Sequence, residues 1–159
     1  MIRLIEENLV RQNKAVMLLS ILLEEEFSRL MNLKPQSVSQ IELSIQELMR
    51  QIAAERVSLR TMVGQMSAGS LRLAEIYPLL EPDVVEALKG LVIMMDDTEQ
   101  KCAMQAAKNN EMATALFDQS KGLLNYMHNQ IKPKNTNAYG RTGRFAKAPS
   151  DARLLTGRL

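Results

Sequence analysis

The chain has 159 residues, of which 46% are hydrophobic and 4% aromatic, with no tryptophan and one cysteine. This length and composition suit one helical domain with an aliphatic core, and a single cysteine excludes an internal disulfide and fits a reducing compartment. No run of about 18 uncharged apolar residues occurs, so we expect a cytoplasmic protein without a membrane span. The net charge of +2 conceals a division, because residues 1–131 carry 13 Lys and Arg against 17 Asp and Glu, whereas residues 132–159 carry seven against one.

Two helices of similar length are predicted over the first 66 residues. From Ile2 to Leu33, ten positions follow alternating steps of three and four, and eight of them are apolar, which is a heptad pattern. The dipeptide Lys34-Pro35 ends this helix, because proline restricts the residue before it. Ser37 or Ser39 is the expected cap of a second helix, whose heptad spacing extends to Met66. So short a connection makes the two helices antiparallel neighbours.

A third, longer helix is predicted after a break at residues 64–82 that is rich in glycine, serine and proline. A short helix expected at 71–77 would close one end of the bundle. From Asp83 to Ile131 there is no proline and helix-favouring residues dominate, which predicts one uninterrupted helix. Asp83 is the expected cap, with Glu86 three residues later as its capping-box partner. The predicted fold is all-α, an elongated antiparallel bundle of three long helices plus a short connecting helix.

The heptad pattern stops after Ile131. Residues 132–159 combine proline, glycine, asparagine and positive charge with little to bury, which is typical of a flexible segment. We therefore predict a bundle domain at 1–131 and a basic, largely disordered tail at 132–159. The tail could hold nucleic acid, with Tyr139 and Phe145 stacking on bases, but an acidic protein surface would explain the same residues at least as well.

The sequence offers little for catalysis. The only histidine, His128, has no second histidine or cysteine near it, and it is expected to interact with the end of the helix dipole. Cys102 lies on the apolar stripe of the long helix, where a small core residue is expected rather than a nucleophile. The acidic clusters lack the spacing of a calcium loop. We therefore expect no enzyme, no cofactor and no metal site.

Four heptad core positions carry polar residues: Gln12, Glu26, Glu55 and Asn109. One interpretation is that the stripe drifts on a straight helix, because 3.6 residues per turn does not divide seven, so that these are boundary residues. The other is a buried polar layer that sets helix register or keeps a groove open for a partner. The eleven methionines also allow two interpretations, core filling or a surface that accepts several partner helices.

Four segments, taken in order, resemble the flagellar export chaperone FlgN family, which serves hook-associated proteins. They are Leu22-Leu-Glu-Glu-Glu26, Ile52-Ala-Ala-Glu-Arg56, Asn109-Asn110 before apolar residues, and Ala138-Tyr-Gly-Arg-Thr-Gly143. The tyrosine-glycine motif is the most specific of them, and the resemblance covers about residues 1–145.

This resemblance implies a non-enzymatic chaperone that binds the C-terminal helices of hook-associated (hook-filament junction) proteins, keeps them monomeric and delivers them to the export gate. It makes Tyr139, with Gly140 and Gly143, the candidate contact to the export-gate platform protein. We expect the long helix to carry the client-binding edge, at Met95, Cys102, Asn109, Asn110, Ala113, Leu116 and Leu123. The alternatives are a structural helical adaptor without a secreted client, or a nucleic-acid-binding protein. The sequence does not identify the client, the oligomeric state or the helix face that binds.

Overall fold

The computed structural model describes residues 1–131, and every regular element in this range is a helix. The elements are α1 (Ile2–Met31), α2 (Pro35–Met66), the 3₁₀ helix η1 (Leu73–Leu79) and α3 (Pro82–Ile131). The predicted all-α fold, with three long helices and a short connecting helix, is confirmed. The tail predicted at 132–159 lies outside the described residues, and its boundary with the bundle stays a prediction.

The helices α1 and α2 run antiparallel, as predicted. Near the start of α1, the Asn8 side-chain amide donates to the Glu55 carboxylate at 2.5 Å. Near its end, the Arg29 guanidinium donates to the Ser37 carbonyl oxygen at 2.8 Å. As the residue number rises in one helix it falls in the other, so the two chain directions are opposed.

The turn between α1 and α2 does not use the predicted serine cap. Lys34 occupies the N-cap position without a side-chain hydrogen bond, and Pro35 is the first helical residue. Proline is favoured there because its φ is already helical and its missing N–H would have no partner in the helix. Ser39 therefore lies inside α2, and its hydroxyl donates to the Pro35 carbonyl oxygen at 3.2 Å. The prediction of Ser37 or Ser39 as the cap was therefore wrong.

The start of α3 differs from the prediction in the same way. The helix begins at Pro82, so Asp83 lies in its first turn and is not the cap. The preceding short helix is also shifted, from the expected 71–77 to Leu73–Leu79, and it has 3₁₀ geometry. The Glu75 carboxylate accepts hydrogen bonds from the Leu71 and Arg72 N–H groups at its start, and these bonds lower the pKa of Glu75.

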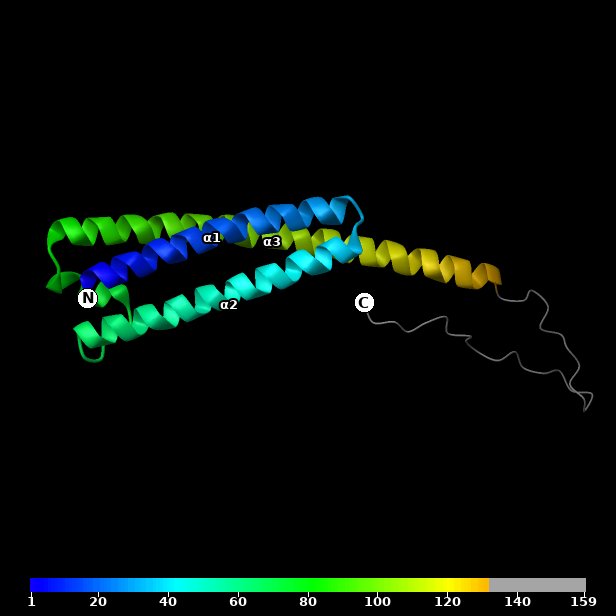
Figure 1. Ribbon diagram of the computed structural model, residues 1–159. Coiled ribbons are helices and arrows are strands. Elements are labelled where there is room, and N and C mark those ends of the chain that lie inside the picture. The colour runs from blue at the N-terminus through cyan, green and yellow to red at the C-terminus, as the bar shows by residue number, and fades with distance from the viewer. Residues whose placement is uncertain (132–159) are drawn as a thin grey trace, which may run out of the picture. The chain divides into compact units, whose positions relative to one another are not determined.

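The chain divides into two compact units, Met1–Ala113 and Thr114–Leu159. Within the first unit, the Asn13 side chain donates to the Leu91 carbonyl oxygen at 3.0 Å, and Asn109 donates to that of Leu23 at 2.8 Å. Residue numbers rise together in these contacts, so α1 and α3 run parallel and the bundle has an up-down-up order. Figure 1 shows α1 beside α3, with η1 at the end where α2 stops and α3 starts.

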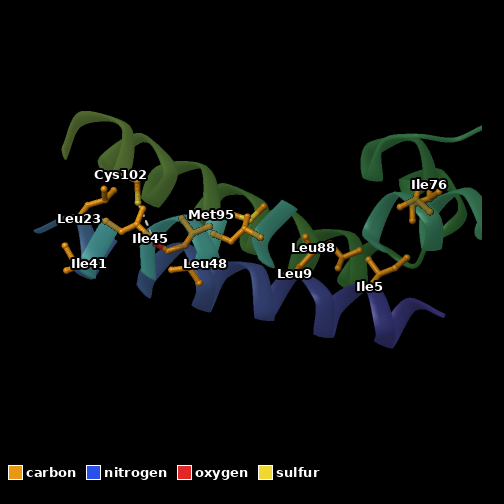
Figure 2. Close-up of a cluster of buried hydrophobic side chains, with 13 residues drawn as sticks. Ile5, Leu9, Leu23, Ile41, Ile45, Leu48, Ile76, Leu88, Met95 and Cys102 are labelled. Atoms are coloured by element: carbon orange, nitrogen blue, oxygen red, sulfur yellow. Dashed lines mark hydrogen bonds between the residues drawn. The ribbon is translucent and has the colours of Figure 1, made fainter. Parts of the chain in front are cut away.

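The core of the first unit is aliphatic. Figure 2 shows it as a row of side chains from all the helices, with Ile76 of η1 near Ile5 at one end. Ile76 is completely buried, so the short helix closes that end of the bundle as expected. The buried members of the core are Ile5, Leu9, Val16, Leu23, Ile41, Ile45, Leu48, Ile52, Val63, Ile76, Leu88, Met95 and Cys102.

Candidate functional site

In the first unit, α3 buries one side chain in every seven. These are Leu88, Met95, Cys102 and Asn109, whose exposed fractions range from 1% to 8%. Seven residues are close to two helical turns, so the four side chains lie on one face of α3. The Cys102 thiol donates to the Val16 carbonyl oxygen of α1 at 3.6 Å. This buried ladder is the surface by which α3 packs on α1.

The C-terminal member of the ladder, Asn109, is polar and fully hydrogen-bonded. The Asn109 side-chain nitrogen donates to the Leu23 carbonyl oxygen and to the Glu26 carboxylate, each at 2.8 Å. Its side-chain oxygen accepts from Gln105 at 2.9 Å. Asn109 is 2% exposed, so the buried-layer interpretation is the correct one here.

A second polar cluster joins α1 to α2. The Glu55 carboxylate accepts from Asn8 at 2.5 Å and from Arg11 Nε at 2.9 Å, and Gln12 donates to the Asn8 side-chain oxygen at 2.6 Å. Asn8 and Gln12 are buried. The hydrogen bond from Arg11 to Glu55 raises the pKa of the Arg11 guanidinium. Gln12 thus belongs to a buried polar layer, as one of the two interpretations proposed, and Glu55 lies half-buried at the edge of that layer.

The Cys102 thiol is poorly suited to nucleophilic chemistry. Burial raises its pKa, and the negative charge of Glu99 raises it further. The thiol therefore stays protonated, and a protonated thiol is a poor nucleophile. Within residues 1–131, the His, Cys, Asp and Glu side chains form no group of three or more that could hold a metal.

In the second unit, the ladder on α3 continues with exposed side chains. Leu116 and Leu123 keep the seven-residue spacing, yet Leu116 is half-buried and Leu123 is 59% exposed. No side chain between 114 and 131 is buried. We call the apolar residues on this side of the helix the α3 stripe: Leu116, Phe117, Leu123, Leu124, Met127 and Ile131. Their spacings of three, four and seven place them on one side of the helix.

The seven predicted edge residues therefore divide into two groups. Met95, Cys102 and Asn109 are buried in the first unit, and Cys102 and Asn109 form hydrogen bonds with α1. Asn110, Ala113 and Leu123 are exposed, and Leu116 is half-buried. The structure does not bring all seven to one exposed edge, and the binding of a client to any of them stays a prediction.

Four members of the α3 stripe were not among the predicted edge residues: Phe117, Leu124, Met127 and Ile131. Their signal was present, since each follows Ala113 at steps of four or seven. The predicted gate contacts Tyr139, Gly140 and Gly143 lie outside the described residues.

Comparison with known proteins decides the family. The family model described as FlgN protein matches residues 1–147. The chain belongs to the FlgN family. No curated protein and no solved structure matched this chain.

FlgN proteins are flagellar export chaperones, and this FlgN-family chain has that general role. The family is one of chaperones and not of enzymes. Within residues 1–131, none of the helices is both long enough and apolar enough to cross a membrane. The α3 stripe presents large apolar side chains to solvent.

Proposed function

We propose that this FlgN-family chain is a cytoplasmic chaperone for hook-associated proteins. It binds their C-terminal helices, keeps them monomeric and delivers them to the flagellar export gate. The observation that carries this proposal is the α3 stripe, together with membership of the family.

The chemistry of the α3 stripe suits an amphipathic client helix. Phe117, Leu124 and Ile131 are between 61% and 65% exposed, which is costly in water unless a partner covers them. Side chains at steps of three, four and seven are those by which one helix packs along another. Asp118 and Lys121 are the only Asp, Glu, Lys or Arg residues between 114 and 131, so little charge must be desolvated when a helix docks.

The test is isothermal titration calorimetry of the full chain with a C-terminal peptide of a hook-associated protein. We expect one-to-one binding with a negative heat-capacity change, because apolar surface is buried. The variant Leu124→Glu should weaken binding by at least about tenfold, since a charge on the α3 stripe must be desolvated. Its thermal unfolding should match that of the parent, because Leu124 is already 65% exposed.

Asn129→Glu is the matched control. It adds the same charge to the same exposed helix, five residues away and on nearly the opposite side. We expect it to bind the peptide as the parent does. Equal weakening by both variants would refute the α3 stripe as the client site. No heat of binding with the parent chain would refute the client proposal and favour an adaptor without a secreted client.

We also propose the export-gate platform protein as a second partner. By the family resemblance, Tyr139 makes the contact, and Gly140 and Gly143 allow the backbone to turn around it. The basic residues 132–159 would be a second functional region, attached to an acidic bundle at 1–131.

A further inference from the structure

The contact between α3 and α1 changes along α3 from apolar packing to hydrogen bonding. The four buried side chains of the ladder are, in order, Leu88, Met95, Cys102 and Asn109. The first two are large and apolar, the third is small, and the fourth is polar. Leu88 and Met95 bury large apolar side chains, whereas Cys102 and Asn109 bury little apolar surface and rely on hydrogen bonds. The hydrophobic contribution to the packing of α3 on α1 is therefore smaller at residues 102–113 than in the first half of α3.

The hydrogen bonds that residues 102–113 of α3 form with α1 add little net stability to the packing of the two helices. Cys102 and Asn109 donate to the carbonyl oxygens of Val16 and Leu23, and Asn109 also donates to the half-buried Glu26 carboxylate. Water replaces such partners when the two helices separate, so most of the bond energy is recovered. Among residues 102–113, Cys102 and Asn109 are the only buried ones. Segments with so few buried contacts open at the lowest free energy.

The surface under this segment is aliphatic. Val16 and Leu23 of α1 and Ile41 and Ile45 of α2 are all buried members of the core. Figure 2 shows Leu23, Ile41 and Ile45 in the part of the core nearest to Cys102. A helix that offered leucine or isoleucine at these positions would bury more apolar surface than Cys102 and Asn109 do.

We propose that residues 102–113 of α3 separate from α1 as a unit and that the exposed groove between α1 and α2 binds an amphipathic helix of the client. The inference rests on the proposed function, because it assumes a client with such a helix. It adds a second client site that is closed in the free protein. It would also give the predicted edge residues Cys102 and Asn109, which are buried in the closed state, a part in client binding.

The first test uses the unmodified chain, whose only cysteine is Cys102. The rate at which a thiol reagent modifies Cys102 is measured at increasing urea concentrations below the unfolding transition. If residues 102–113 open by themselves, the rate will depend on urea much less steeply than global unfolding does, because less surface is exposed. A urea dependence equal to that of global unfolding would overturn the proposal.

The second test locks the segment to α1. Ser20 of α1 lies close enough to the Cys102 thiol to lower its pKa, so Ser20→Cys brings a second thiol near Cys102. We expect the reduced variant to bind the client peptide as the parent does, and the oxidised variant to bind at least about tenfold more weakly, since the open state is no longer populated. The double variant Ser20→Cys/Cys102→Ser cannot form the bond and should be insensitive to oxidant.

Equal affinity of the oxidised and reduced variants would overturn the closed-groove site and leave the proposed function intact. Absence of binding by the parent chain itself would instead refute the proposed function. The two failures are therefore distinguishable in one titration series.

Discussion

The Glu55 carboxylate is where the polar contacts between α1 and α2 converge. It accepts hydrogen bonds from the buried Asn8 amide and from the Arg11 guanidinium, and its side chain is 29% exposed. The two donors have different surroundings, because Asn8 is fully buried whereas the Arg11 side chain is 52% exposed. A buried donor that loses its acceptor costs more than an exposed ion pair contributes.

We therefore predict unequal effects of removing the two ends of the Arg11–Glu55 pair. Glu55→Ala should lower the free energy of unfolding by about 1–3 kcal/mol, because one Asn8 N–H is left buried without an acceptor. Arg11→Ala should cost less than about 1 kcal/mol, as expected for an exposed ion pair. Urea unfolding monitored by circular dichroism measures both values. Equal losses would mean that the ion pair, and not the Asn8 hydrogen bond, is what stabilises this layer.

At the scale of the helix, α2 carries a surface cluster whose effect depends on pH. The Arg50 guanidinium donates twice to the Glu47 carboxylate, at 2.7 and 2.9 Å, and Gln51 donates to it at 3.1 Å. These bonds lower the pKa of Glu47 from its ordinary value of 4.5 to about 2. Because the pKa in the folded state is the lower one, the stabilisation is present above pH 4.5 and is lost as the pH falls toward 2.

The variant Glu47→Gln tests this pH dependence. Its melting temperature should be slightly below that of the parent at pH 6, and the difference should shrink as the pH is lowered from 4.5 toward 2. Glu42→Gln is the control, since Glu42 is an exposed glutamate of the same helix with no ion pair among residues 1–131. A difference for Glu47→Gln that stays constant over this range would show that the carboxylate charge does not stabilise α2.

Heptad spacing predicted which segments are helical, but it described only one contact line per helix. Asn8 and Asn13 fall outside the predicted heptad positions of α1, yet they are 0% and 5% exposed. The reason is that α1 packs against both α2 and α3, so its buried face is wider than a single seam. The helix starts at Pro35 and Pro82 differ from the predicted caps for a local reason. Serine and aspartate are common caps, but a proline nearby is favoured at the first helical position and moves the start of the helix to itself.

At the scale of the whole molecule, the sequence predicted which face of α3 is apolar, but it did not predict which residues of that face are buried. Met95 and Leu123 occupy equivalent heptad positions and are both apolar, but Met95 is 8% exposed and Leu123 is 59% exposed. Periodicity assigns a side chain to a face, whereas its burial depends on whether a partner helix lies there. Leu116 and Leu123 lie on the part of α3 whose side chains are not buried, whereas Cys102 and Asn109 are internal, and client binding to any of them stays a prediction.

At the same scale, client binding and delivery are predicted to depend on different parts of the chain. If Tyr139 contacts the export gate and the client binds along α3, then Tyr139→Ala should leave the affinity for the client peptide unchanged and reduce export of hook-associated proteins severely. An aromatic side chain at the centre of an interface is often one of the few that carry most of the binding energy, which is why one truncation should suffice.

Phe145→Ala is the control for this experiment, because it removes the other aromatic residue that lies among the arginines of the basic segment. It should leave both client affinity and export close to those of the parent. Calorimetry measures the first property, and secretion of hook-associated proteins by cells that carry each variant measures the second. Normal export with Tyr139→Ala would remove the assignment of Tyr139 to the gate. Equal loss of export with both variants would instead assign delivery to the aromatic and basic character of residues 132–159 as a whole.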